Sequence, residues 1–280
     1  MPSLSPRVLR RFIIAVIFLA VFFLFGYGTR QLTQPTPTCI DGVKNGEEEG
    51  VDCGLFACQN YCEPDLDPPQ VVSVKILKTG DNLPGQGDYD FVAEINNPNK
   101  EFGASEVVYE LTLFNGDEKE LLKKAGTFYI LPDQTKYLVL TFLTTERNVS
   151  RVDLGIKSAK WQRLDSLEGM NLIVRRERYL VSPNGQSSTL DAVIFNDSDF
   201  EFETVDIDVI LRDSADKIIA VNRSEIRTFL ARTERNFRVT WPFPIGSRVA
   251  SMEVRASTNL FENSNFIKNY GSEVEKFQEY

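Results

Sequence analysis

The feature that most constrains this chain is an internal repeat with a spacing of about 97–100 residues. The repeat is one of apolar pattern rather than of identical residues, as expected when one fold occurs twice in a chain. The matching segments are Ile95–Asn96 with Phe195–Asn196, Tyr109–Leu113 with Ile207–Leu211, Leu138–Phe142 with Phe237–Trp241, and Ser150–Val152 with Ser247–Val249. The sequence therefore predicts two copies of one fold over residues 71–163 and 171–257.

Within each copy the apolar residues recur at every second position. Leu138, Leu140 and Phe142 alternate with other residues in the first copy, as do Ile207 and Val209 in the second. Alternation places one set of side chains on a buried face of a strand and leaves the other set in water. With turn signals between the runs, the pattern predicts about seven short strands per copy.

Strands of this number and spacing favour an all-β fold made of two tandem antiparallel β-sandwiches, with a β-barrel as the alternative. Each copy resembles an immunoglobulin-like or fibronectin-like module in this pattern. No pair of cysteines spans either copy, so the resemblance lacks the intersheet disulfide of antibody domains.

Catalysis is not predicted, because the 280-residue chain contains no histidine. Histidine is the commonest general base and metal ligand near neutral pH, and a catalytic triad needs it. The acid pairs Asp206/Asp208 and Glu201/Glu203 alternate along a strand and could approach glycosidase spacing. They alternate with buried apolar residues and are therefore predicted to be solvated. The chain is predicted not to be an enzyme.

Three tyrosines lie outside the alternating positions that are predicted to be buried. They are better candidates for a flat carbohydrate-binding surface than the other aromatic residues, which are predicted to lie in the core. They are Tyr129, Tyr137 and Tyr179. Otherwise the sequence leaves the residues that bind a partner unknown.

The N-terminal segment predicts a single membrane anchor. Residues Phe12–Phe25 are all apolar, and Gly26–Gly28 extends the run. Arginines at 7, 10 and 11 precede it, so residues 1–11 are predicted to be a cytoplasmic stub and 12–28 a transmembrane helix. The alternative is a cleaved signal peptide ending at the small-x-small triplet 26–28. Both readings place the bulk of the chain outside the cytoplasm.

The exported portion is acidic. All 40 acidic residues follow Arg30, against 31 − 4 = 27 basic ones, so residues 31–280 carry a formal charge of −13. Such a charge repels nucleic acid and anionic head groups, so no nucleic-acid partner is predicted.

The four cysteines all fall in one short module, residues 39–62: Cys39, Cys53, Cys58 and Cys62. Outside the cytoplasm they are expected to form two disulfides, with all three pairings open. Zinc is the rival ligand, but the spacing lacks two close cysteine pairs. A stiff, proline-rich linker over 63–70 is predicted to follow.

Residues 39–54 resemble a module of prokaryotic cell-surface proteins, C-x-D-G-x-x-N-G-x-E-x-G-x-D-C-G-G-x-C. This chain departs from it at Leu55, where the module has a second glycine, and by one extra residue before Cys58. The resemblance implies a cell-surface location and no particular activity.

The same module is rich in oxygen ligands, which makes calcium the one candidate cofactor. The candidate ligands are Asp41, Asn45, Glu47, Glu49 and Asp52. The alternative is turn chemistry, because Asp-Gly and Asn-Gly form tight turns.

Together these features predict a non-catalytic interaction protein of the cell membrane, working in adhesion or cell-envelope assembly with a protein or envelope polymer as partner. The alternative is a ligand-sensing or solute-binding ectodomain, with 164–170 as a hinge between the domains. The tail, 258–280, has no clear period and is predicted to be extended or disordered, docking through Phe261 and Phe266.

Overall fold

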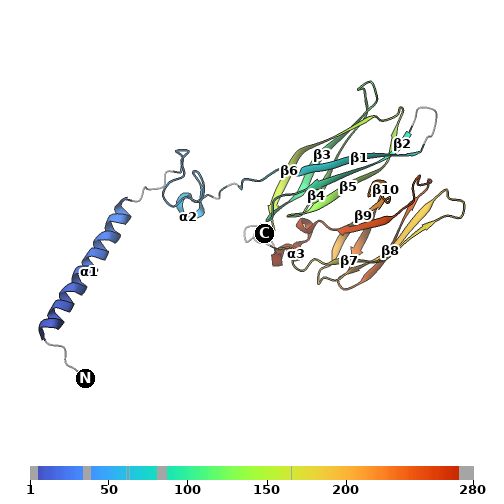
Figure 1. The fold of residues 1–280 in the computed structure, drawn as a ribbon. Coiled ribbons are helices and arrows are strands. Elements are labelled where there is room, and N and C mark those ends of the chain that lie inside the picture. Colours follow the sequence, from blue (N-terminus) through green and yellow to red (C-terminus); the bar gives the residue numbers. More distant parts are fainter. Residues whose placement is uncertain are drawn as a thin grey trace. The chain divides into compact units, whose positions relative to one another are not determined.

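The computed structural model describes residues 6–33, 39–60, 62, 64–80, 87–164 and 166–270. It divides into two compact units, residues 1–65 and 66–280, which are described separately. The first holds a long helix and the disulfide module, and the second holds all the strands (Figure 1).

Helix α1 runs from Pro6 to Thr33 and contains the predicted apolar segment. Its described apolar side chains, such as Phe18 and Phe22, are exposed. Among the residues whose side chains the structure describes, no helix is both long and apolar enough to cross a membrane. Phe12 and Gly28, the ends of the predicted span, lie outside those residues. The helix is therefore confirmed, while its crossing of a membrane is not supported by the structure.

Two disulfides hold the module together, as predicted. Cys39 pairs with Cys58 and Cys53 with Cys62, with Cα–Cα distances of 5.5 and 5.0 Å. The module's only described helix, α2 (Leu55–Cys58), is one turn long and buries no residue. The disulfides therefore replace a hydrophobic core, as disulfides do in small domains that cannot build one.

Reducing the two disulfides is expected to open the module and leave the strand unit unchanged. The cross-links close loops within residues 39–62, and the strands belong to the other compact unit. With dithiothreitol, protease sites in the module should become accessible, while the main thermal transition should stay within about 1 °C. A large fall in that transition would show that the two units stabilise each other.

The second unit contains twelve strands among its described residues. They are β1 (Gln70–Gly80), β2 (Gly87–Asn96), β3 (Phe102–Phe114), β4 (Glu120–Ile130), β5 (Thr135–Thr145), β6 (Arg151–Arg163), β7 (Leu172–Val181), β8 (Ser188–Asn196), β9 (Phe202–Arg212), β10 (Ile218–Phe229), β11 (Glu234–Trp241) and β12 (Ser251–Ser257).

These strands form four three-stranded antiparallel sheets, and the topology repeats. The first repeat pairs sheets β1-β2-β5 and β4-β3-β6, and the second pairs β7-β8-β11 and β10-β9-β12. Each repeat is thus sandwich-like, which confirms the all-β prediction. The prediction of about seven strands per copy is wrong for the described residues, which give six, because several long runs such as Arg151–Arg163 form one strand each.

The repeat extends to its turns. After β3, the side chain of Asn115 accepts hydrogen bonds from the backbone N–H groups of Asp117 and Lys119. After β9, Asp213 does the same with Ala215 and Lys217. A short polar side chain that caps the backbone two and four residues ahead fixes a tight turn. The two β-hairpins are therefore closed by the same device.

A buried asparagine marks equivalent positions in the two repeats. The Nδ2 of Asn97 donates to the carbonyls of Phe102 and Leu131, at 2.7 and 2.9 Å. The Nδ2 of Asn196 donates to the carbonyls of Phe200 and Leu230, at 2.8 and 3.1 Å. Both residues are fully buried. Asn97, rather than Asn96, is therefore the structural counterpart of Asn196, which shifts this part of the sequence alignment by one residue.

Each repeat has its own apolar core. The first core is built around Phe91, Leu111 and Ile130, and the second around Ile194, Phe229 and Trp241. The predicted alternation holds in β3. It does not hold in β5, where residues 136–140 are all buried and Phe142 is 64% exposed.

A β-bulge explains the exposure of Phe142. The register of β5 against β2 shifts between Tyr89 and Phe91, and Phe142 takes a left-handed backbone conformation with φ of 58°. Its N–H donates to the buried carboxylate of Asp90 at 3.0 Å. The extra residue turns Phe142 outward and brings Leu143 into the core.

Burial raises the pKa of Asp90 from 3.8 to about 6. Between these values the folded chain holds a proton that the unfolded chain releases, so the free energy of unfolding should fall as the pH rises from about 4 to 6. Asp90→Asn removes the charge and keeps an acceptor for the Phe142 N–H. It should stabilise the protein at pH 8 by about 1 kcal/mol and have little effect at pH 4. Urea unfolding of both proteins at pH 4 and pH 8 measures the difference. Equal effects at the two pH values would show that the pKa of Asp90 is not raised.

The two repeats pack against each other through a further apolar cluster. It joins Val92, Tyr137 and Val139 from the first repeat to Ile210 and Val221 from the second. Sheet β1-β2-β5 is therefore covered on both faces, by its own core and by β9 and β10 (Figure 1). A hinge over 164–170 is not favoured, because Leu164 is buried in the core of the second repeat and residues 66–280 form one unit.

The segment after β12 is ordered up to Tyr270. A 3-10 helix, Leu260–Glu262, leads into helix α3, Ser264–Tyr270. Phe266 is fully buried and Phe261 packs beside it against the second core. The prediction of an extended or disordered tail is therefore wrong for residues 260–270, although both phenylalanines dock. Residues 271–280 lie outside the part of the chain that the structure describes.

Candidate functional site

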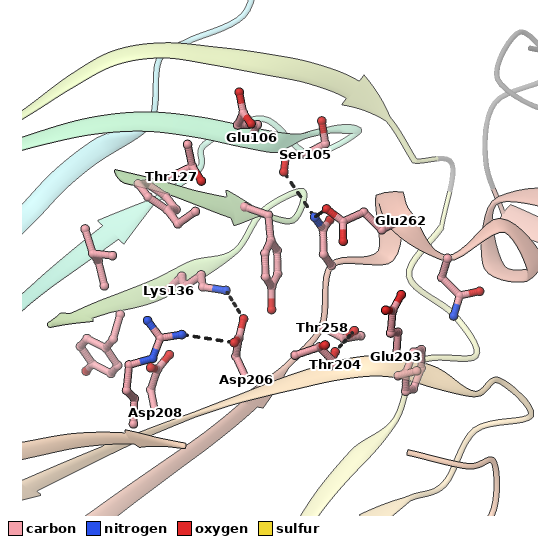
Figure 2. Close-up of a pocket in the computed structure, with 18 of the residues that line it drawn as sticks. Ser105, Glu106, Thr127, Lys136, Glu203, Thr204, Asp206, Asp208, Thr258 and Glu262 are labelled. Atoms are coloured by element: carbon pink, nitrogen blue, oxygen red, sulfur yellow. Dashed lines mark hydrogen bonds and ion pairs between the residues drawn. The ribbon is translucent and has the colours of Figure 1, made fainter. Parts of the chain in front are cut away.

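A cleft of about 760 Å³ lies between the two repeats (Figure 2). Strands β3, β4 and β5 line it from the first repeat, and β9, β10 and the segment from Thr258 to Asn265 line it from the second. Its volume falls within the range of small-molecule sites. Polar side chains line much of it, including Ser105, Glu106, Thr127, Lys136, Glu203, Thr204, Asp206, Asp208, Thr258 and Glu262.

Lys136 forms the inner wall of the cleft. Strand β5 carries it, and it is 7% exposed. Its Nζ lies 3.3 Å from the centre of the Tyr129 ring, 3.4 Å from Ser257 Oγ and 3.9 Å from the carboxylate of Asp206. Burial lowers the pKa of Lys136 to about 8, against the attraction of Asp206 and Asp208. Lys136 is thus a buried amine that keeps its charge only with help from the facing repeat.

The acids opposite Lys136 are not solvated, contrary to the sequence-based interpretation. Asp208 is 6% exposed, and burial raises its pKa to about 6, although Lys136 and Arg223 act in the opposite direction. Asp206 is half-buried and pairs with Arg223 at 3.3 Å (Figure 2). These alternate residues of β9 point away from their own core toward the first repeat. A charged network therefore joins the repeats.

Two of the three predicted platform tyrosines lie at the same interface. Tyr129 is 8% exposed and shares a hydrogen bond of 3.0 Å with Ser257, and burial raises its pKa well above the usual value. Tyr137 is 3% exposed, and its hydroxyl donates to Glu253 at 3.2 Å. Neither presents an open ring face, so neither is a carbohydrate platform. Tyr179 is half-buried in a different cavity of the second repeat.

The mouth of the cleft is acidic. Glu106, Glu201, Glu203 and Glu262 line it with exposed side chains. With Asp206 and Asp208, the lining holds six carboxylates against the two cations Lys136 and Arg223. The inner acids are paired with those cations, so the excess charge lies with the four glutamates. This arrangement favours a cationic ligand or one that donates hydrogen bonds.

Three of the five predicted calcium ligands, Asp41, Asn45 and Asp52, form hydrogen bonds within the module's own turns. The carboxylate of Asp52 accepts from the N–H groups of Asp41 and Gly42 at 2.9 and 2.7 Å. Asp41 accepts from the Val43 N–H and from the Asn45 amide. Within the described residues these five side chains do not gather around one point. In the part of the chain that the structure describes, the group of acids and cysteines close enough to share an ion is Cys39, Glu48 and Cys58, and its two sulfurs are joined in a disulfide. The geometry fits the turn alternative.

Comparison with known proteins does not identify a family. No family model and no curated protein matches the sequence. Among solved structures, a transglutaminase of red sea bream matches with a TM-score of 0.22 and 10% identity, over 68% of this chain. The match spans 29% of the length of that enzyme. A likeness this weak supports no argument about function.

Proposed function

We propose that this chain is a non-catalytic interaction protein held at the outer side of a cell membrane by its N-terminal helix. The disulfide module acts as a spacer, and the two repeats are immunoglobulin-like domains that present binding surfaces to a protein or an envelope polymer. Adhesion and assembly of a cell-envelope complex are the roles that suit such a body.

The buried contact between the repeats is the observation that carries this proposal. Val92, Val139 and Ile210 pack between the sheets, and the charged network around Lys136 closes one side. The repeats therefore form one body with its outer sheets and edges in a fixed relation, as a binding scaffold requires.

Two further features support the location. The apolar segment Phe12–Phe25 follows three arginines, and its described side chains are exposed, as lipid contact requires. Two disulfides occur in chains that fold in an oxidising compartment.

Crosslinking on intact cells tests the proposal. Full-length protein is crosslinked with an impermeant reagent and recovered with its partners, and carbonate extraction reports whether it stays with the membrane. We expect membrane retention and a defined protein or polymer partner. Release by carbonate, or no partner together with a tightly bound small molecule, would contradict it.

A second candidate function is ligand binding in the cleft between the repeats. The volume of about 760 Å³ favours this alternative, as do the four exposed glutamates at its mouth, Glu106, Glu201, Glu203 and Glu262. A small organic cation such as spermidine is the suitable probe. The double variant Glu203→Gln/Glu262→Gln should weaken its binding at least tenfold, while Glu177→Gln on the exposed part of β7 should not. Equal loss in all variants would show unspecific attraction to an acidic surface.

A further inference from the structure

A second cavity, of about 300 Å³, opens at one end of the second repeat. It lies between the β7–β8 hairpin and the loop that precedes β12. Its lining residues are Tyr179, Val181, Gly185, Ser187, Ser188, Ile245, Ser247, Arg248 and Val249. No feature of the cleft between the repeats extends to it.

Ser188 gives this cavity an unused hydroxyl. The residue is 3% exposed and lies on the same face of β8 as Leu190 and Ile194 of the core. Its Oγ is buried and has no hydrogen-bond partner among the residues that the structure describes. Buried polar groups are nearly always satisfied, so an orphaned hydroxyl that lines a cavity points to a missing partner.

The first repeat shows what fills the equivalent space. Tyr89 lies eight residues before Asn97, just as Ser188 lies eight residues before the equivalent Asn196. Tyr89 is 3% exposed and packs in the first core. Its hydroxyl accepts a hydrogen bond of 3.1 Å from the Val149 N–H, in the loop that precedes β6. A phenol ring thus connects strand and loop in one repeat, and a cavity separates them in the other.

In the second repeat, Trp241 fills only part of the space that the Tyr89 ring takes in the first repeat. It is the cross-strand neighbour of Ser188, where Leu143 faces Tyr89 in the first repeat. Its indole N–H donates to the Val221 carbonyl at 2.9 Å, and its ring meets Tyr179 edge-on. Trp241 does not line the cavity, so the space beneath residues 245–249 stays open.

We propose that this cavity binds an aromatic ring of the phenol class, in the place that a tyrosine side chain takes in the first repeat. The volume is sufficient, because an apolar cavity of about 150 Å³ already holds benzene. Val181 and Val249 offer apolar contact, Tyr179 offers an aromatic neighbour, and Ser188 Oγ offers the polar partner. The ring comes either from a free phenolic compound or from a tyrosine of a peptide partner. The inference does not depend on the function proposed above.

Titration of the full-length protein with 4-fluorophenol, followed by ¹⁹F NMR, tests the proposal. We expect saturable binding below about 10 mM. Ser188→Tyr supplies the ring in cis and should weaken binding at least tenfold while raising the melting temperature. Ser188→Leu fills the cavity with a smaller side chain. It should also weaken binding if the tyrosine side chain is too large for the cavity. Ser188→Ala keeps the cavity and should weaken binding only a few-fold.

Competition separates the two sources of the ring. Displacement by phenol but not by N-acetyltyrosinamide indicates a free compound, and displacement by both indicates a tyrosine side chain. Binding that is not saturable, or equally strong binding to the natural protein and to both filling variants, would overturn the proposal.

Discussion

Replacing Lys136 by methionine should destabilise the protein by about 3–5 kcal/mol at pH 7, because Lys136 is still charged there and its removal leaves a buried carboxylate without a nearby cation. Methionine has a similar length and fills the space. Methionine cannot compensate the negative charge of Asp208, which is 6% exposed. Asp206 keeps Arg223 as a partner at 3.3 Å, so the loss falls mainly on Asp208. Urea unfolding of the full-length protein measures it.

The pH dependence of this loss identifies its cause. The pKa of Asp208 is raised to about 6, above its value in the unfolded chain. The folded state therefore binds a proton more readily, and stability falls as the pH rises through that range. Without Lys136 this dependence should become steeper. The variant should thus lose much less stability at pH 5, where Asp208 is protonated, than at pH 7, where Asp208 is ionised and Lys136 is charged.

A double variant provides the control. Lys136→Met/Asp208→Leu replaces two buried charges of opposite sign by apolar groups and should recover most of the stability, because opposite buried charges contribute little over well-packed apolar groups. A single variant within about 1 kcal/mol of the natural protein, at both pH values, would show that the network is hydrated and does not hold the repeats together.

The apolar pattern predicted the repeats and most of their core, but not the contact between them. Alternation looks the same whether the polar face of a strand meets water or a second sheet that supplies opposite charges. The alternation therefore predicts a solvated Asp208, whereas the structure buries it. The apolar residues Val139 and Ile210, at polar-face positions of their strands, were the available signal that these faces are covered.

Other features needed three-dimensional geometry. The cysteine spacing predicted two disulfides, but four cysteines allow three pairings, and only the fold of the module selects Cys39 with Cys58. The sequence predicts no helix at the end of the chain, because a helix of seven residues is too short to show a clear period. Phe266 and Tyr270, one turn apart and in ring contact, were its one periodic signal.

The β-bulge at Phe142 was likewise hidden from sequence analysis, since Phe142 and Trp241 occupy matching places in the repeat. The structure gives them opposite environments, with Phe142 64% exposed and Trp241 1% exposed. A one-residue insertion in a strand reverses the facing of the side chains beyond it.

Trp241→Ala should therefore cost about 3–5 kcal/mol, whereas Phe142→Ala should change stability by no more than about 0.5 kcal/mol. The tryptophan loses its core packing, its contact with Tyr179 and its hydrogen bond to the Val221 carbonyl. The phenylalanine loses little, because its backbone N–H, and not its ring, holds the bulge to Asp90. Denaturant unfolding of both variants compares them directly. Equal losses would mean that Phe142 is buried in solution and that the two repeats have the same register throughout.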